Sequence, residues 1–195
     1  MIKNFILCGV GGQGTVLASK IIAETALMQG MYVRTTETIG MAQRGGSVVS
    51  HVRISDSCID SPLVPYGEAE LILAFEPCEA VRCLPYLKKG GCVVTNSAVV
   101  TPVSSSLSGK NFDSEAMNAY IAGTGASVKV IDGNAVCRKC GSDKVLNTAL
   151  LAAAALTGHL GITLDSLRKS IAARVSPKYL DINLAAISAV EESSK

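Results

Sequence analysis

Two glycine-rich stretches hold the residues of this chain whose types and spacing are best suited to chemistry. In the first, Gly9, Gly11 and Gly14 form a G-x-G-x-x-G pattern that also contains Gly12 and Gln13. The pattern follows an apolar run and precedes a helical one, which is the context that a nucleotide-binding loop requires. Free N–H groups at a helix start attract anions. The loop is therefore a candidate site for a phosphate-bearing ligand, although the same glycines would also let a helix pack tightly on a sheet.

The second stretch covers residues 37–47 and is polar as well as glycine-rich. Its candidate binding residues are Gln43, Arg44, Gly45 and Gly46. An arginine presents a planar fork of donors that matches carboxylate and phosphate groups, and the adjacent glycines allow a ligand to approach the backbone. We expect this loop to meet a phosphate, a carboxylate or an acidic group of a partner subunit. A solvated loop arginine is the alternative.

A dinucleotide site also needs an acidic residue near the end of the second strand, to hold the ribose hydroxyls. Counting about 20 residues from Gly9 leads to Gln29 and Gly30, which carry no acid, and Glu37 is the nearest candidate. The lack of a convincing acid argues against a stand-alone NAD(P)-dependent enzyme, which is kept as an alternative function. A nucleotide-binding regulatory module is another alternative.

Cysteine and histidine residues supply no second centre of chemistry. Cys137 and Cys140 form a C-x-x-C pair with two basic residues between them, but a structural zinc site needs four ligands. The pair is read as inert thiols, with a redox-active pair as the alternative. His51 and His159 have no nucleophile or carboxylate beside them in the sequence. We therefore predict no metal site and no catalytic residue in this chain.

Composition narrows the remaining classes of protein. The formal net charge is +2 and no long run of like charges occurs, which argues against a nucleic-acid partner. The longest strictly apolar run, residues 149–156, is far shorter than the roughly 18 residues that span a bilayer. The seven cysteines are an odd number, as expected for reduced thiols. We expect a cytoplasmic protein without a membrane segment.

The elements that must position these loops alternate between strand and helix. Apolar runs predict strands, helical spacing predicts helices, and Gly30, Pro77 and Gly90 mark helix boundaries. Strands are expected over residues 5–8, 31–34, 47–54, 71–75, 92–95 and 128–132. Helices are expected over residues 15–28, 77–88, 115–121, 143–156, a segment beginning after Thr163, and 179–192.

This order predicts a single α/β domain over residues 1–195, built on a mostly parallel, Rossmann-like doubly wound sheet with helices on both faces. Residues 97–127 are expected to form an irregular excursion, and residues 142–195 a helical C-terminal part.

The two loops together resemble a known family. The pairing of GVGGQGT with ETIGMAQRGGSVVSHVRI is similar to the signature of the gamma-type domain of 2-oxoacid:ferredoxin oxidoreductases. Residues 69–87, Asn147 and Asn183 also fit, and the likeness is weakest over residues 97–127. Within the family, the Met-Ala-Gln-Arg-Gly-Gly form is most similar to the beta subunit of indolepyruvate oxidoreductases.

This resemblance implies a subunit of an enzyme that decarboxylates a 2-oxoacid on thiamine diphosphate and Mg²⁺. Such an enzyme passes electrons through iron–sulfur clusters to ferredoxin and transfers the acyl group to coenzyme A. An aryl pyruvate such as indolepyruvate is the implied substrate, while pyruvate, 2-oxoglutarate and branched-chain acids remain open.

The chain itself lacks the motifs for these cofactors. It has no C-x2-C-x2-C-x3-C-P run for clusters, and Asp132-Gly133-Asn134 only echoes the thiamine diphosphate signature. We therefore expect a larger catalytic subunit to carry them, and this chain alone to be inactive and to bind no cofactor tightly. The glycine loop and Arg44 would help to form the coenzyme A or substrate entrance. A homodimer of the isolated chain remains open.

Overall fold

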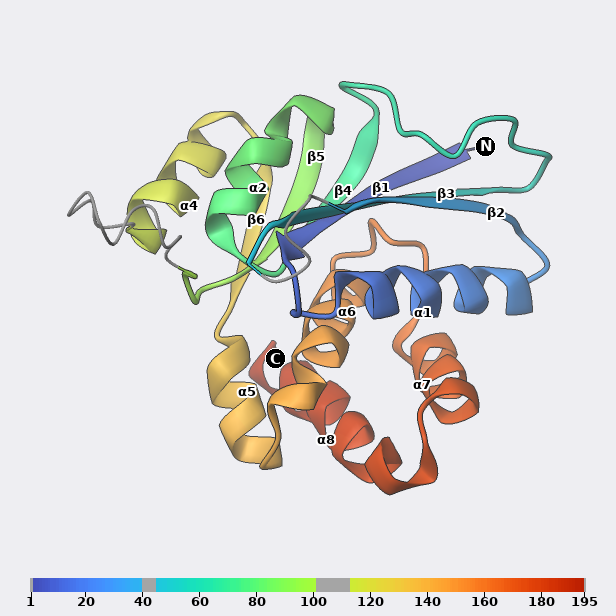
Figure 1. Cartoon of the computed structure of the whole chain (residues 1–195), viewed down its shortest axis with the longest axis vertical. Coiled ribbons are helices and arrows are strands. Elements are labelled where there is room, and N and C mark those ends of the chain that lie inside the picture. The colour runs from blue at the N-terminus through green and yellow to red at the C-terminus, as the bar shows by residue number, and fades with distance from the viewer. Residues whose placement is uncertain (1, 40–44, 101–112, 195) are drawn as a thin grey trace.

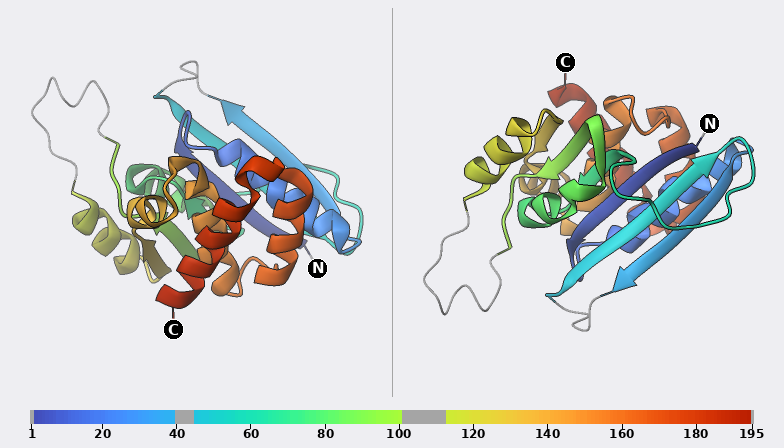
Figure 2. Two further views of the ribbon diagram at one scale, coloured as in Figure 1. Left: turned by 90° about the horizontal axis from the view of Figure 1, so that it is seen from below. Right: turned by 90° about the horizontal axis from the view of Figure 1, so that it is seen from above.

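The strands form one sheet at the centre of the molecule. The computed structural model describes residues 2–39, 45–100 and 113–194. In these residues a six-stranded sheet has the order β2-β3-β1-β4-β5-β6 (Figures 1 and 2). The strands are β1 (Ile2–Val10), β2 (Tyr32–Ile39), β3 (Ser47–Ser55), β4 (Ala69–Ala74), β5 (Leu87–Asn96) and β6 (Ser127–Ile131).

The sheet is mostly parallel, as the sequence predicted. β1, β4, β5 and β6 pair in parallel. β3 pairs antiparallel with both β1 and β2, so β3 alone among the described strands runs against the others. After β1 the next strands, β2 and β3, lie toward one edge of the sheet. The later strands, β4, β5 and β6, lie toward the other edge. The switch point of the topology therefore lies between β1 and β4, where ligands bind in open α/β sheets.

Strand β1 shows how alternation divides the core into two layers. Phe5 and Leu7 pack into the larger apolar cluster, while Ile6 and Cys8 belong to a separate cluster on the opposite face. All four side chains are fully buried, as expected for a central strand with both faces covered.

Helices cover both faces, which confirms the predicted arrangement (Figure 1). The larger cluster lies under α1 (Thr15–Met28), α6 (Leu146–Leu156), α7 (Leu164–Arg174) and α8 (Pro177–Ser193). Helix α5 (Gly133–Cys140) and the short helix η2 (Asp143–Val145) join this side beside α6 and α8. The smaller cluster lies under α2 (Pro77–Cys83), the 3-10 turn η1 (Leu84–Tyr86) and α4 (Ser114–Gly123).

Several element boundaries differ from the sequence prediction, and each difference has a physical reason. Strand β2 extends through residues 35–39, which were read as loop because residues 35–38 are polar. As an edge strand, β2 can carry polar side chains. Helix α2 ends at Cys83 because Pro85 follows, and Lys88, Lys89 and Gly90 lie in β5. Helix α5 was not predicted; Asp132 caps its start.

Candidate functional site

The glycine loop links β1 to α1 at the switch point. Gly12 and Gly14 have φ angles of 102° and 89°, a region that favours glycine. Gly14 is the N-cap of α1, which has no side-chain cap and no acidic residue in its first turn. The first N–H groups of a helix lack intrahelical partners, and they carry the positive end of the helix dipole. The loop therefore offers an uncapped helix start to an anion.

Gln13 fixes the shape of this loop. Its Oε1 accepts a hydrogen bond from the Val10 N–H at 2.7 Å, and its Nε2 donates to the Phe75 carbonyl at 3.4 Å. The side chain thus ties the end of β1 to the residue that follows β4. Gly9 leaves room for this contact, since a Cβ there would lie 2.7 Å from Gln13 Oε1. Gln13 and Gly9 therefore fix the shape of the loop.

The two glycine-rich stretches meet in the structure. The Gly11 N–H donates to the Gly46 carbonyl at 2.8 Å, which joins the glycine loop to the start of β3. Gly45 is exposed and has a φ angle of 80°. Gln43 and Arg44 lie outside the described residues, so their part in the site stays a prediction.

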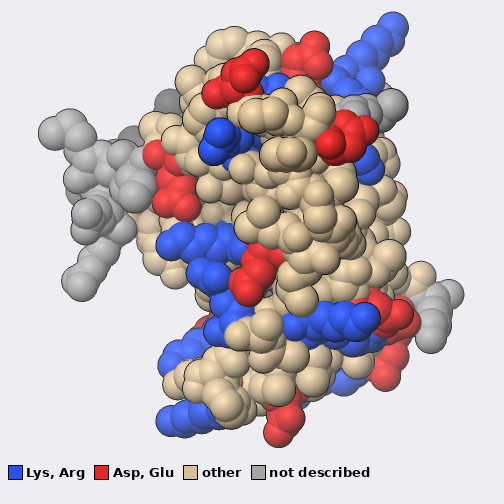
Figure 3. Space-filling view, turned by 90° about the vertical axis from the view of Figure 1, so that its right-hand side faces the viewer, with Lys and Arg blue, Asp and Glu red and all other residues tan. Residues whose placement is uncertain are grey.

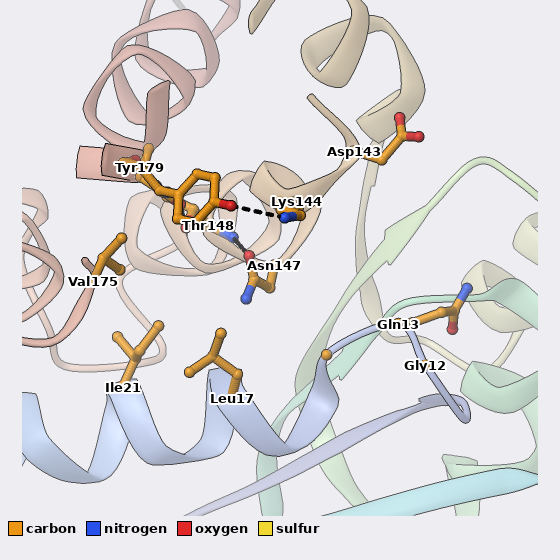
Figure 4. Close-up of a pocket in the computed structure, with 12 residues that line it drawn as sticks. Gly12, Gln13, Leu17, Ile21, Asp143, Lys144, Asn147, Thr148, Val175 and Tyr179 are labelled. Carbon is orange, nitrogen blue, oxygen red and sulfur yellow. Dashed lines mark hydrogen bonds between the residues drawn. The ribbon is translucent and has the colours of Figure 1, made fainter. Parts of the chain in front are cut away.

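A pocket of about 440 Å³ lies between the glycine loop and the C-terminal helices (Figure 4). Its apolar wall comes from Leu17 and Ile21 of α1 and from Val175. Its polar side includes Lys144 and Tyr179, which come from η2 and α8. The remaining lining residues are Gly12, Gln13, Gly14, Asp143, Asn147, Thr148 and Asn183.

Hydrogen bonds hold the polar side of the pocket in place. Lys144 Nζ donates to Tyr179 Oη at 3.0 Å and lies 4.5 Å from the centre of the same ring. Asn183 Nδ2 donates to the Tyr179 carbonyl at 2.7 Å, and Thr148 Oγ1 donates to Asn183 Oδ1 at 2.5 Å. This network joins α6 and α8 behind the pocket and orients the lysine ammonium and the tyrosine hydroxyl.

Asn147 faces the glycine loop from α6. Its Oδ1 accepts from the Thr148 N–H at 2.8 Å, which leaves its Nδ2 directed toward the loop (Figure 4). A Cβ built on Gly14 would lie 3.5 Å from that Nδ2. An amide donor, an ammonium group and an uncapped helix start therefore converge on one hollow. Such a set of donors is suited to phosphate or carboxylate oxygens.

A second hollow, of about 500 Å³, lies on the other side of the glycine loop. It shares Gly12, Gly14 and Leu17 with the first pocket and adds two cationic residues, Lys20 and Arg174. Arg174 Nη1 is paired with Glu24 Oε2 at 2.9 Å. Cationic side chains thus flank the loop on both sides.

The buried carboxyl groups of Glu76 and Glu79 follow β4 in the chain, and both accept hydrogen bonds that stabilise the local structure. Glu76 caps α2 by accepting from the Glu79 N–H at 3.0 Å, and burial raises the pKa of this carboxyl. Glu79 Oε2 accepts from Ser47 Oγ at 2.5 Å. Because the second bond fixes the start of β3, these carboxyl groups hold the surroundings of the glycine loop.

The sheet order argues against a dinucleotide site. In the dinucleotide-binding fold the second strand lies directly beside the first, and its terminal acid reaches the ribose. Here β3 lies between β1 and β2. Glu37 is therefore one strand further from the glycine loop, and it accepts from Ser19 Oγ at 3.4 Å.

The described residues do not fit the metal-dependent cofactors that the resemblance implies. No group of three or more His, Cys, Asp or Glu side chains among them could hold a metal ion. Asp132 accepts from the Ala135 N–H at 2.9 Å as the cap of α5. Cys137 and Cys140 are free thiols, and burial raises the pKa of Cys137. In the described part of the chain no helix is long and apolar enough to cross a membrane.

Residues 4–192 match the model of a family described as pyruvate ferredoxin/flavodoxin oxidoreductase. This chain belongs to that family. The match covers nearly the whole chain and confirms the resemblance on which the sequence interpretation relied.

Similar proteins agree with this assignment. The chain is 34% identical over 185 residues to indolepyruvate oxidoreductase subunit IorB of Thermococcus kodakarensis, covering 94% of this chain and 91% of the relative. It is 36% identical to the subunit of the same name from Methanothermobacter thermautotrophicus, covering 94% and 93%. The chain also aligns with the common gamma subunit of the pyruvate/ketoisovalerate oxidoreductases of Thermococcus litoralis. The two are 35% identical over 91 residues, which cover 46% of this chain and 49% of that subunit.

A solved structure has the same fold. It is the gamma subunit of a keto/oxoacid ferredoxin oxidoreductase from Geobacter sulfurreducens, with a TM-score of 0.73 and 24% identity, and the alignment covers 98% of this chain and 95% of that one.

The structure adds residues that sequence reasoning did not place in the site. Lys144, Thr148, Val175 and Tyr179 come from the C-terminal helices, far from the glycine loop in sequence. Asn147 and Asn183 had been noted as part of the family resemblance without a role. No spacing rule links these residues to Gly9–Gly14, because they come together only when α6 packs on α1 and α8 packs on α6.

Proposed function

We propose that this chain is the small subunit of an indolepyruvate oxidoreductase complex. The observation that carries the proposal is the extent of the similarity. The two IorB subunits align with this chain over more than nine-tenths of both lengths, whereas the gamma subunit from Thermococcus litoralis aligns over about half. An aryl pyruvate is therefore the 2-oxoacid that we assign to the complex.

In this proposal the redox chemistry belongs to a larger partner subunit, which would carry thiamine diphosphate, Mg²⁺ and iron–sulfur clusters and would pass electrons to ferredoxin. The absence of cluster and thiamine diphosphate motifs from the sequence supports this division. So does the use of Asp132 as a helix cap.

The role that we assign to this chain is to receive a phosphate-bearing co-substrate, coenzyme A, at the glycine loop. Support comes from the uncapped start of α1, from the Asn147 amide directed toward it and from the Lys144 ammonium across the same pocket. The apolar wall of Leu17, Ile21 and Val175 would cover a non-polar part of the ligand.

Kinetics of the reconstituted complex test this role. The variant Lys144→Met removes one charged donor from the pocket, and a charged hydrogen bond contributes about 1.5 kcal/mol. We expect the KM for coenzyme A to rise roughly tenfold while the KM for indolepyruvate stays unchanged. Lys169→Met is the matched control, since Lys169 is exposed on α7 and does not line the pocket. An unchanged KM for coenzyme A would remove this role from the pocket.

A further inference from the structure

The outer edge of β2 is open to another strand. Among the described residues β2 is the last strand on its side of the sheet, and Figure 2 shows it along the rim of the molecule. It has eight residues in continuous register with β3, without a bulge. It contains neither proline nor lysine. Natural sheets protect their edges with such features, because unpaired N–H and C=O groups attract other strands.

The opposite edge of the described sheet is protected. Strand β6 has only five residues, and Lys129 lies at its centre. A short edge strand with a lysine resists pairing. The contrast indicates that β2, and not β6, is built for contact with another strand.

The surroundings of β2 are also suited to protein contact. Tyr32, at its start, is 53% exposed, and the nearby Leu27 and Met28 at the end of α1 are 60% and 59% exposed. A hollow of about 380 Å³ between Leu27, Tyr32 and Ile59 adjoins the strand. Apolar side chains beside an open edge favour its burial.

The charges of β2 restrict how it can pair with its own copy. In an antiparallel pair related by a twofold axis, one residue lies on the axis opposite its own copy. Arg34 on the axis would face another Arg34, and Glu37 would face another Glu37, which is unfavourable. Thr35 or Thr36 on the axis avoids both pairs and gives a Thr–Thr pair, which stabilises sheets. These two central registers also give the longest overlap of the strand with its copy.

We propose that a second copy of this chain pairs its β2 antiparallel with this β2, across a twofold axis at Thr35 or Thr36. The two sheets then form one continuous sheet. This contact is isologous, since the same surface serves both subunits. In the Thr35 register, Tyr32 lies opposite Thr38 and Arg34 opposite Thr36, so no like charges meet. The pairing does not depend on the proposed enzymatic role.

Sedimentation of the full chain tests the dimer, and engineered cysteines test its register. Paired residues in an antiparallel sheet have Cα atoms about 4.5–5.5 Å apart, within the range for a disulfide. Thr35→Cys and Thr36→Cys are made separately in a Cys58→Ser background, because Cys58 is an exposed free thiol. We expect a dimer, with rapid oxidation to a covalent dimer for the variant whose cysteine lies on the axis. Ser188→Cys on the exposed side of α8 is the control and should stay uncrosslinked.

The double variant Thr35→Lys/Thr36→Lys should sediment as a monomer with an unchanged circular dichroism spectrum, since it places like charges at the axis. A wild-type chain that is monomeric at high micromolar concentration would overturn the proposal. So would a dimer in which neither cysteine variant crosslinks faster than Ser188→Cys. A chain that is monomeric alone but protects β2 amides from exchange when bound to the larger subunit would also overturn it, in favour of a strand from that subunit.

Discussion

Gly9 lies near the end of β1, and the side chains of Gln13 and Phe75 leave no room for a larger residue at this position. A Cβ at this position would lie 2.7 Å from Gln13 Oε1 and 2.8 Å from the Cβ of Phe75. Real Cβ atoms do not approach so closely, so a larger residue would displace the Gln13 side chain and with it the tie between β1 and β4. The glycine is therefore required by packing, independently of any ligand.

The variant Gly9→Ala should lower the free energy of unfolding by about 1–3 kcal/mol, the usual cost of overpacking a buried site. Denaturant titration measures the change. Gly123→Ala is the control, because Gly123 lies at the end of α4 with no atom within 4 Å of a new Cβ. The control should be neutral or slightly stabilising, since alanine favours a helix more than glycine does. Equal stability of the two variants would contradict this account of Gly9.

Hydrogen bonds from polar side chains of β2 and β3 hold the segment of residues 56–68 against the sheet. Arg53 donates to the Ser61 carbonyl at 2.9 Å, and Arg34 donates to the Ile59 carbonyl at 3.1 Å. His51 is buried, and its Nδ1 accepts from the Val64 N–H at 3.1 Å. That bond requires a neutral imidazole.

Burial lowers the pKa of His51 below its ordinary value of 6.5. The unfolded chain therefore binds more protons than the folded chain in the window between the lowered pKa and 6.5. The contribution of His51 to stability is complete above pH 6.5 and is lost as pH falls through the lowered pKa. The free energy of unfolding should decrease in that window, and the Val64 amide should lose protection from hydrogen exchange.

His51→Asn keeps an acceptor near the position of Nδ1 and cannot become protonated in this range. The variant should therefore lose this part of the pH dependence. If its unfolding curve keeps the same acid slope as the wild type, His51 is not the source.

The contribution of Glu76 to the pH dependence of unfolding has the opposite sign. Burial raises the pKa of its carboxyl above 4.5, so the folded chain holds the proton more tightly than the unfolded chain. The stability that Glu76 provides is complete below pH 4.5 and decreases as pH rises through the raised pKa. Glu76→Gln keeps an acceptor for the Glu79 N–H and removes this slope. Glu76→Ala loses the cap of α2 and should cost about 1 kcal/mol in urea titrations at pH 7. Equal stabilities of the two variants would show that the cap contributes nothing.

The sequence predicted the elements that carry an apolar run or a clear helical spacing. The central strands β1, β4 and β5 each contain a short, mostly apolar run that predicted part of the strand, and α1 was predicted with its observed bounds, Thr15–Met28. The length of β2 was not predicted, because polar residues 35–38 resemble a loop unless their pairing with β3 is known. Nor was the antiparallel place of β3 between β2 and β1, since alternation within a strand does not specify its neighbours.

At the scale of the molecule, the candidate site belongs to the assembled fold rather than to one segment. The glycine loop could be found from its motif, but Lys144 and Tyr179 reach it only through the packing of α6 on α1 and of α8 on α6. On the face seen in Figure 3, Lys and Arg side chains are interspersed with Asp and Glu. This mixed face agrees with the small net charge of +2.

The most direct test of the account measures oxidation of indolepyruvate, dependent on coenzyme A, by reduction of a viologen dye. The purified chain, the larger subunit and the reconstituted complex are compared under anaerobic conditions. We predict that only the reconstituted complex reduces the dye, and that indolepyruvate gives a higher kcat/KM than pyruvate or 2-oxoglutarate. Turnover by the isolated chain, or an unchanged rate of the larger subunit when this chain is added, would contradict the account.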